Sequence, residues 1–439
     1  MASLLASAFP ALENEPNDKE AAMGLNKRQF LTGAAGLGAA GLTFAAAQES
    51  PSPAPITPNL AKNAKPIGRE ERLRRLAKLQ MLMRENDVGM TVIEPGAAMI
   101  YFTGLRWWRS ERPTLVLIPA EGQVGVVTPY FEEPSVQETI GVSAVVRTWH
   151  ENEDPFAVVR SFATEWKADE RKVAIEETVR FFVANGVGEA LPGARIVSGA
   201  PLTQACRMVK SPAELALMQT ANDITLAAYK DVAATVAPGM TSAEVSALMS
   251  ERTRAYGGDV QFSMVLLNEA SAYPHGTNTP QTVKEGGIIL MDCGCAVHDY
   301  ESDVSRTFVL GEPTAKQKEV FATVKRGQEI ALETARIGVE AGAVDRAVRS
   351  FYAERGWGPG YKTPGLSHRL GHGIGLEGHE PINLVENERT TLEAGMCFSN
   401  EPGLYTFGEF GVRLEDCFTM TEAGPKLFTP LSPSITQPV

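Results

Sequence analysis

Four acidic residues stand in strand-like segments of the last third of the chain, and their spacing groups them in pairs. Asp292 and Asp303 are 11 residues apart, on two apolar segments joined by a short connection. Glu401 and Glu415 are 14 residues apart, across a second short connection that runs through Gly403 and Gly408. His372 is flanked by glycines, which let the backbone turn tightly and present the imidazole ring. If these segments converge, four carboxylates and one histidine meet in one place.

Such a cluster needs positive charge. Four neighbouring buried carboxylates cannot all stay ionised unless their charge is compensated. Two divalent cations would cancel the four negative charges and could polarise one shared water molecule. Four carboxylates and one imidazole form a set rich in hard oxygen ligands, which suits Mn²⁺ or Fe²⁺ at least as well as Zn²⁺. The alternative is that each residue acts alone, as a solvated turn carboxylate or a structural histidine.

The sequence around these five residues is more specific than the residues themselves. The relevant motifs are Met291-Asp292-Cys293-Gly294, Tyr300-Glu301-Ser302-Asp303-Val304-Ser305-Arg306-Thr307-Phe308, residues 371–381, Asn400-Glu401-Pro402-Gly403-Leu404-Tyr405 and Gly411-Val412-Arg413-Leu414-Glu415-Asp416. With them the chain resembles the metallopeptidases of the creatinase, prolidase and methionine-aminopeptidase group, the M24 family with the pita-bread fold. The resemblance extends over residues 68–425.

The resemblance implies a role for each of the five residues. Asp292 would chelate one metal ion, and Asp303 and Glu415 would bridge both ions. His372 and Glu401 would complete the second site, and Glu401 would carry a proton from the bridging water to the leaving amine. The implied cofactors are two divalent metal ions, Mn²⁺ first, with Co²⁺, Fe²⁺ and Zn²⁺ as alternatives. The implied reaction is hydrolysis of a peptide bond by a metal-bridging hydroxide.

Three further histidines and one arginine lie near these motifs. In aminopeptidase P-like and prolidase-like enzymes, histidines placed like His275, His368 and His379 line the substrate cleft and stabilise the tetrahedral intermediate. A structural role for one of the three is the alternative. Arg413 matches a family arginine that orients the carboxylates; its alternative is a surface ion pair, which usually contributes little.

Other possible metal ligands are expected to play no part. His150 and His298 match no family motif. Cys293 and Cys295 alternate with Asp292 along one strand, so they should point to the face opposite Asp292. We expect both cysteines to be small buried apolar residues.

The helix and strand signals predict two regions. Residues 68–205 begin with a helix near Arg69 and continue with short strands joined by Pro/Gly turns, which predicts an α/β domain. Residues 206–430 are predicted to be α+β, the fold class of the catalytic domain, with capping boxes at Ser211–Glu214 and Thr241–Glu244 starting two helices. The remaining predictions for this region are a helix over residues 315–336, another ending at Gly356, and strand pairs 288–295 with 304–310 and 396–400 with 411–419.

The first 47 residues are expected to be an export leader. Lys27-Arg28 precedes a Gly/Ala-rich apolar run that ends in three alanines, so the segment resembles a twin-arginine signal with Lys in the first position. Met23 is an alternative start, because residues 1–22 are acidic. A Pro-rich linker is predicted over residues 48–66. The expected location is the periplasm or the exterior; a disordered tail on a cytoplasmic protein is the alternative.

Composition narrows the class of protein. The net charge of -12 argues against nucleic-acid binding, which needs a basic surface. The leader run is too short and too rich in Gly and Ala for a membrane span. Five scattered cysteines in 439 residues do not form a disulfide framework.

The N-terminal domain distinguishes this chain from the shorter methionine aminopeptidases. The resemblance then favours an Xaa-Pro dipeptidase or aminopeptidase P acting on short peptides, expected to be a homodimer. Trp107 and Trp108 are candidates for the dimer interface or for contact with a neighbouring active site. The alternatives are a non-peptide hydrolase such as creatinase, a dimethylsulfoniopropionate-lyase-like enzyme with Gly378 at the position of its base, and a histone-chaperone relative. The complete ligand set argues against creatinase and the chaperone.

Overall fold

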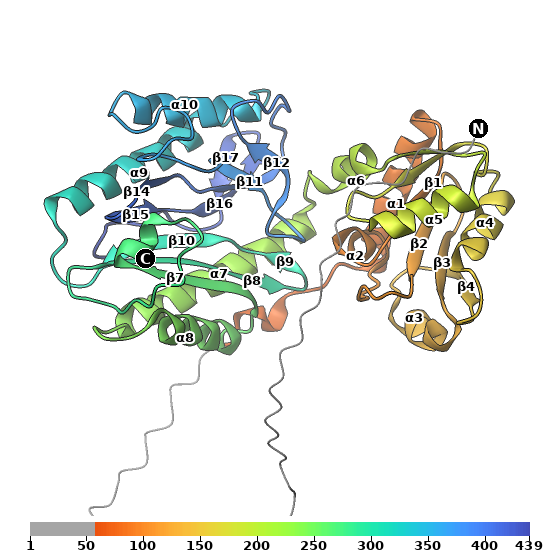
Figure 1. Cartoon of the computed structure of the whole chain (residues 1–439), viewed down its shortest axis with the longest axis horizontal. Coiled ribbons are helices and arrows are strands. Elements are labelled where there is room, and N and C mark those ends of the chain that lie inside the picture. Colours follow the sequence, from red (N-terminus) through yellow and green to blue (C-terminus); the bar gives the residue numbers. More distant parts are fainter. Residues whose placement is uncertain (1–57) are drawn as a thin grey trace, which may run out of the picture. The chain divides into compact units, whose positions relative to one another are not determined.

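The computed structural model describes residues 58–439, shown in Figure 1. The predicted leader, residues 1–47, and the first part of the predicted linker lie outside the described residues. The last part of that linker contains a short 3-10 helix, η1 (Leu60–Asn63). The Leu60 N–H donates a hydrogen bond to the Tyr256 carbonyl at 2.8 Å. This end of the segment therefore packs on the folded chain instead of being a free linker.

A six-stranded sheet forms the first region, with strand order β4-β3-β2-β1-β5-β6. Its strands β1, β2 and β3 are apolar and buried throughout, because helices cover both faces. The β1–β5, β5–β6 and β3–β4 pairs are parallel, and the β1–β2 and β2–β3 pairs are antiparallel. The strands are β1 (Val88–Ile93), β2 (Leu115–Pro119), β3 (Val124–Pro129), β4 (Ala144–Trp149), β5 (Lys172–Ile175) and β6 (Arg195–Ser198).

The helices of this region divide between the two faces of the sheet. Leu79 and Phe102, from α1 and α2, pack in one apolar core cluster. Phe162 and Val187, from α4 and α5, pack in another, against alternate residues of the same strands. This arrangement is the predicted α/β organisation. The helices are α1 (Arg69–Glu85), α2 (Ala97–Thr103), α3 (Glu133–Thr139), α4 (Pro155–Glu165), α5 (Phe181–Ala190) and α6 (Ala200–Arg207), with the 3-10 turn η2 (Tyr130–Glu132).

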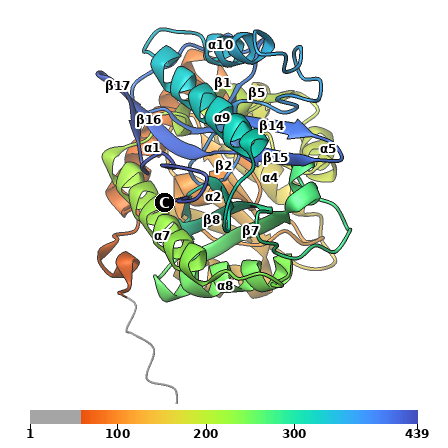
Figure 2. The same cartoon turned by 90° about the vertical axis from the view of Figure 1, so that its left-hand side faces the viewer.

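Two antiparallel sheets form the second region, and a pair of long helices covers each of them. Figure 2 shows α7 and α8 on one outer side of these sheets and α9 and α10 on the other. The side chains of α7 and α8 share an apolar core with β7, β8 and β10. Those of α9 and α10 share another core with the strands of the second sheet. The helices are α7 (Pro212–Thr235), α8 (Ser242–Ala255), α9 (Ala315–Thr334) and α10 (Ala341–Ala353).

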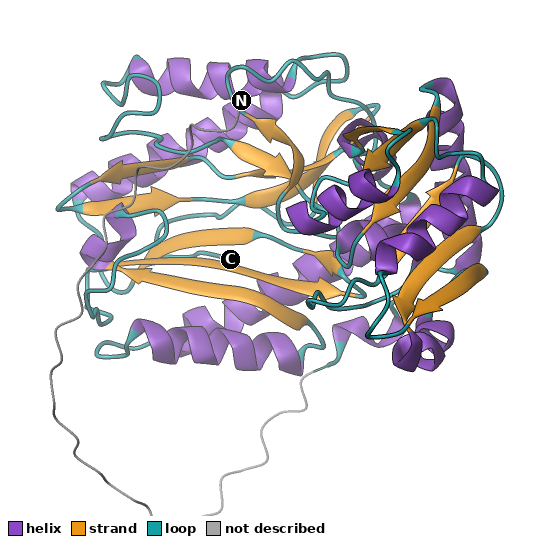
Figure 3. Ribbon diagram, turned by 45° about the vertical axis from the view of Figure 1, so that its right-hand side comes forward, coloured by secondary structure: helices purple, strands orange, loops and turns teal. Residues whose placement is uncertain are grey.

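The sheets of the second region are contributed by successive parts of the chain. Figure 3 shows the strands in orange, with the helices in purple outside them. The first sheet has the order β10-β8-β7, with β9 paired to β8, and the second has the order β12-β11-β13-β16-β17. Strands β14 and β15 form a separate hairpin. The strands are β7 (Asp259–Leu267), β8 (Ile288–Val297), β9 (Tyr300–Glu301), β10 (Val304–Val309), β11 (Gly371–Gly373), β12 (Glu380–Leu384), β13 (Cys397–Asn400), β14 (Gly403–Thr406), β15 (Phe410–Arg413), β16 (Asp416–Thr421) and β17 (Gly424–Leu427), with the 3-10 turn η3 (Asn268–Ala272) between β7 and β8.

The predicted α+β class and most of the predicted elements are confirmed. Ser211 and Thr241 cap their helices through complete capping boxes, and β8 pairs antiparallel with β10. The single strand predicted over residues 411–419 is wrong, because the chain forms two strands there. Instead of continuing a ladder, the Glu415 N–H donates to the Ser305 carbonyl at 3.1 Å, which separates β15 from β16. Among the described residues, no helix is both long enough and apolar enough to span a membrane.

Candidate metal centre

The five predicted ligands converge between the two sheets of the second region. Asp292, Asp303 and Glu415 each offer a ligand atom within 4.8 Å of the other two. His372, Glu401 and Glu415 form a second such group. Glu415 belongs to both groups, so the arrangement can hold two cations that share a carboxylate.

Strand register explains why the carboxylates meet. Asn400 lies opposite Asp416 in the β13–β16 ladder, so Glu401 and Glu415 leave that ladder side by side. In the first sheet Asp292 lies opposite Ser305. Asp303 is two residues before Ser305 and therefore faces the same side of the sheet. The Ser305 hydroxyl donates to Glu415 Oε2 at 2.7 Å and so links the two sheets at the site.

The glycines around His372 allow close approach of neighbouring backbone. A Cβ atom on Gly371 would collide with the Ser399 carbonyl, and one on Gly373 with the Pro381 carbonyl. Within this tight turn, His372 Nδ1–H donates to the Gly373 carbonyl at 3.0 Å. The Nε2 atom of His372 is therefore left as an acceptor aimed at the cluster.

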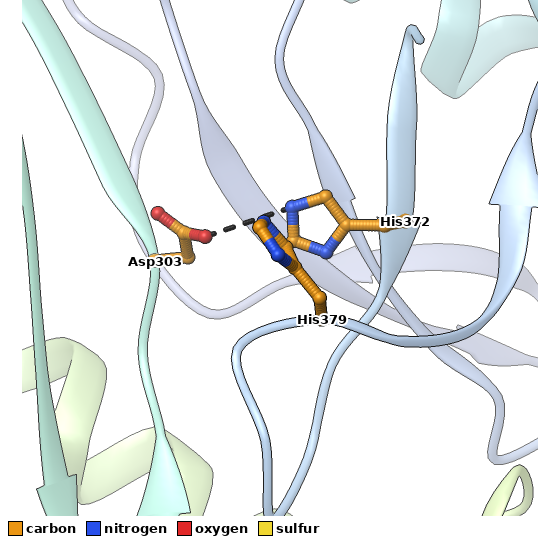
Figure 4. Close-up of side chains that lie close together, drawn as sticks. All are labelled: Asp303, His372 and His379. Carbon is orange, nitrogen blue, oxygen red and sulfur yellow. Dashed lines mark ion pairs between the residues drawn. The ribbon is translucent and has the colours of Figure 1, made fainter. Parts of the chain in front are cut away.

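His372 Nε2 lies 3.6 Å from Asp303 Oδ2 and 3.3 Å from Glu401 Oε1. Figure 4 shows the ring pointing toward Asp303, with His379 beside it. His379 lies edge-to-face with His372 at 4.3 Å between ring centroids. It forms a third possible metal-binding group with Asp303 and His372. The predicted cleft histidine thus lies next to the predicted ligands.

The pKa values of the carboxyl groups in the cluster indicate that their negative charge needs compensation by cations. Burial, together with the neighbouring carboxylates, raises the pKa of Asp303 and of Glu415 well above ordinary values. Burial also raises the pKa of Glu401 to about 7, against the opposing effect of Arg413. Burial lowers the pKa of His372 well below its usual value, so the imidazole is neutral and able to bind a metal.

Unsatisfied atoms show where cations fit. Asp292 Oδ1, Asp303 Oδ1 and Glu415 Oε1 are buried oxygens without a hydrogen-bond partner. A buried carboxylate oxygen is normally hydrogen-bonded or bound to a metal. These three oxygens, one of them on the shared carboxylate of Glu415, match the donor set of a two-cation site together with the Nε2 atom of His372.

Arg413 is buried at the centre of the site. Its guanidinium donates to Asp292 Oδ2 at 2.7 Å, to Ser305 Oγ at 2.9 Å and to the Tyr405 hydroxyl at 3.2 Å. Burial opposes the charge, but nearby acidic groups raise the Arg413 pKa well above its usual value. Arg413 is therefore a buried residue in direct contact with Asp292, and it does not form the surface ion pair considered as the alternative.

The three histidines predicted to face substrate all line one cavity of about 630 Å³ over the cluster. His275 and His379 are exposed at it. His368 is more enclosed: its Nε2 bonds the Tyr405 hydroxyl at 2.8 Å and its Nδ1 the Arg369 carbonyl at 2.7 Å. Burial and the charge of Arg413 lower the pKa of His368 to about 3. Both of its ring nitrogens already have partners, so His368 meets the cavity as a neutral ring.

The residues expected to be incidental do lie away from the cavity. His150 packs beside Tyr130 at 4.9 Å between ring centroids, and His298 lies 3.3 Å from the Ala64 carbonyl. Cys293 and Cys295 are buried in apolar clusters on the helix side of β8.

Sequence reasoning did not single out several residues that complete the cavity wall. Phe262 and Met264 come from β7, Glu301 from β9, and Arg369 from the loop before β11. Burial, followed by the charges of Glu377 and Glu380, raises the pKa of Glu301 to about 7. The available signal for Glu301 was its position two residues before Asp303, which places both side chains on one face of the strand.

Comparison with known proteins agrees with this architecture. The profile described as "Metallopeptidase family M24" matches residues 216–422. The profile described as "Creatinase/Prolidase N-terminal domain" matches residues 75–209.

Individual relatives match over most of their own length. The probable dipeptidase PepE of Mycobacterium bovis is 31% identical over 355 residues, which cover 80% of this chain and 92% of the relative. The Xaa-Pro dipeptidase of Lactobacillus helveticus is 29% identical over 364 residues, covering 81% and 96%. The crystal structure of dipeptidase PepE from Mycobacterium ulcerans superimposes with a TM-score of 0.78 at 29% identity, covering 85% of this chain and 99% of that one. With its creatinase/prolidase N-terminal domain and pita-bread catalytic domain, the chain belongs to metallopeptidase family M24.

Proposed function

We propose that this metallopeptidase is an Xaa-Pro dipeptidase that works with two Mn²⁺ ions. The observation that carries the proposal is the pair of ligand groups sharing Glu415, with three buried carboxylate oxygens left unpartnered. The dipeptidase assignment draws support from the relatives, two of which carry dipeptidase names and match over 92% and 96% of their own length. Manganese is proposed because the donor set is mainly carboxylate oxygen.

Each ligand residue has a place in this proposal. Asp292 would hold one cation, Asp303 and Glu415 both cations, and His372 and Glu401 the other. When bound, the two cations would lower the pKa of a shared water molecule and polarise the scissile carbonyl. The protein supplies the remaining proton transfer.

Glu401 is the proposed proton carrier. Its side chain lines the cavity and lies 3.3 Å from His372 Nε2, so it stands beside the ligand cluster, where a carboxylate can accept a proton and release it again. It would accept a proton as the attack begins and deliver it to the leaving amine. His275 and His379 are proposed to bind the substrate, because both are exposed in the same cavity. His368 and Arg413 are proposed to act with them. His368 would contribute an uncharged ring to the cavity wall, and Arg413 would hold the Asp292 carboxylate in position.

The test is a metal-dependent assay with matched peptides. The protein is stripped of metal, reloaded with Mn²⁺ and given Xaa-Pro dipeptides, Xaa-Pro tripeptides and the corresponding Xaa-Ala peptides. Mass spectrometry reads the products, and Glu401→Ala serves as the inactive control. Release of Xaa from the dipeptides alone supports the proposal, whereas release from tripeptides identifies an aminopeptidase. No cleavage of any peptide by the fully loaded protein rejects peptidase action in favour of a hydrolase or lyase with another substrate.

We also propose that the protein is a homodimer that is exported to the periplasm or beyond. The dimer proposal rests on exposed aromatic side chains of the N-terminal domain: Trp108, Phe131 and Phe181 are 60%, 59% and 83% exposed. Light scattering on the wild type and on Trp108→Ser tests it, and a monomeric wild type rejects it. The export proposal rests on the leader sequence alone. Cell fractionation with and without residues 1–47 tests it.

A further inference from the structure

The cavity over the ligand cluster contains a carboxylate, that of Glu301, which has no role in the proposed mechanism. It ends strand β9, opposite Ala296 of β8, and lies two residues before Asp303. Its side chain lines the cavity together with Gly378. A Cβ atom on Gly378 would lie 3.1 Å from Glu301 Oε2, so the glycine leaves room for this carboxylate.

Two other acidic residues lie close to Glu301, and both are already paired with basic residues. Glu380 is buried and accepts from Arg207 at 2.6 Å and from Lys210 at 2.9 Å. Although burial opposes ionisation, Lys210 and Arg207 lower the pKa of Glu380 to about 2. Glu377 lies 2.7 Å from Arg207. These ion pairs use both local cations.

Glu301 has no such partner. Within residues 58–439 it forms no ion pair at 4.0 Å or less. The local group therefore contains three carboxylates and two cations, and the unpaired carboxylate is the one that faces the cavity. An unpaired carboxylate in a partly buried cavity is a favourable place for an incoming cation, because a charge-assisted hydrogen bond replaces lost hydration.

We propose that Glu301 is a specificity-determining residue that binds a cationic group of the peptide, either its free α-amino group or a basic side chain. This inference rests on the proposed function only for the identity of the ligand as a peptide. The two sources of the cation share one chemistry, an ammonium or guanidinium donor to a carboxylate. They differ in which peptides lose affinity when the carboxylate is removed.

The kinetic test compares the Mn²⁺-loaded wild type with Glu301→Gln on Ala-Pro, Lys-Pro and Glu-Pro. Glu377→Gln is the matched control, since this carboxylate is in the same group but is paired with Arg207. If Glu301 binds the α-amino group, KM should rise about tenfold or more for all three dipeptides. If it binds a basic side chain, the rise should be confined to Lys-Pro. Unchanged KM for both Ala-Pro and Lys-Pro would overturn the proposal.

Metal content separates substrate binding from damage to the metal centre. Asp303 is near in sequence, so the metal content of each variant is measured by elemental analysis. A Glu301→Gln protein with full metal content, raised KM and little change in kcat supports a binding role. Loss of metal that fully accounts for the lost activity would overturn it.

A binding experiment makes the inference independent of turnover. Calorimetry measures the affinity of the Mn²⁺-loaded protein for alaninamide and lysinamide, with propionamide as the uncharged comparison. Weaker binding of either amine to Glu301→Gln than to wild type supports the proposal even if no dipeptide is cleaved, in which case only the proposed function fails. Equal binding by the two proteins would overturn the role of Glu301 even if dipeptides are cleaved.

Discussion

Arg306 and Asp416 form a fully buried ion pair directly behind Glu415. Arg306 Nη2 lies 2.6 Å from Asp416 Oδ1, and both side chains are 0% exposed. A second nitrogen of the Arg306 guanidinium, Nη1, donates to the Glu415 carbonyl at 2.8 Å. Asp416 Oδ2 accepts from Gln328 at 2.9 Å. The pair thus fixes the backbone of the carboxylate shared by both ligand groups.

Replacing Asp416 with Asn should strongly destabilise the protein. The substitution leaves the Arg306 guanidinium buried without its countercharge, which typically costs about 3–5 kcal/mol. Urea denaturation measures the free energy of unfolding. Glu333→Gln is the comparison, since it removes an exposed partner of Arg326 and should change stability little. Similar losses in the two variants would show that the buried ion pair contributes no more to the free energy of unfolding than the exposed one.

Replacing Arg413 with Lys should weaken metal binding while the fold is retained. A lysine ammonium keeps the charge but cannot make the directed bonds to Asp292, Ser305 and Tyr405 at once. Loss of such a partner to a ligand typically lowers metal affinity or activity about 10–100-fold. Isothermal titration calorimetry with the metal measures the affinity of the wild type and of the variant. Circular dichroism checks that the variant is folded. Unchanged affinity would mean that Asp292 is oriented by other contacts.

Gly371→Ala should destabilise the turn that presents His372. The added methyl group would collide with the Ser399 carbonyl, and overpacking of this kind typically costs about 1–3 kcal/mol. Thermal denaturation checks this. The matched control is Gly68→Ala, because a Cβ there has no neighbour within 4 Å. Equal melting temperatures for the two variants would contradict the steric explanation.

The metal-free protein should lose stability as the pH rises. The pKa of Glu401 is raised from 4.5 to about 7, and those of Asp303 and Glu415 are also raised. A carboxyl group whose pKa is higher in the folded than in the unfolded protein stabilises the fold fully at a pH below its unfolded-state pKa. This stabilisation is lost as the pH rises through its folded-state pKa. Metal-free protein should therefore be less stable at pH 8 than at pH 5.

Two comparisons test that assignment. Added Mn²⁺ should raise the melting temperature more at pH 8 than at pH 5, since cations offset the charge of the ionised cluster. Glu401→Gln should flatten the pH profile of the metal-free protein between pH 4.5 and 7. A metal-free protein whose stability increases over this range would show that another group dominates.

Local patterns in the sequence were enough to predict helices, and the motifs around the five candidate ligands were enough to predict that these residues meet. The Ser211 and Thr241 capping boxes are short-range patterns, and both are present in the structure. The prediction failed at one strand whose bounds depend on a long-range contact. The strand predicted over residues 411–419 divides because the Glu415 N–H bonds to Ser305, 110 residues earlier along the chain.

The rest of the candidate site was beyond prediction for the same reason. Tyr405 holds His368 through a contact between residues 37 positions apart, and no spacing in the sequence indicates it. Glu301 is left without an ion-pair partner because the two nearby basic residues, Arg207 and Lys210, already pair with Glu377 and Glu380. Such competition among charges exists only after the chain has folded.

The ligands are divided between two sheets, with Asp292 and Asp303 on one side and His372, Glu401 and Glu415 on the other. Neither half of the catalytic domain holds a complete coordination sphere, so the second half must be synthesised and docked before either cation is fully held. The cations would then bind late in folding and would hold the two halves of the domain together. The compartment in which the chain finishes folding would thus determine, through the cations available there, which metal the finished enzyme carries.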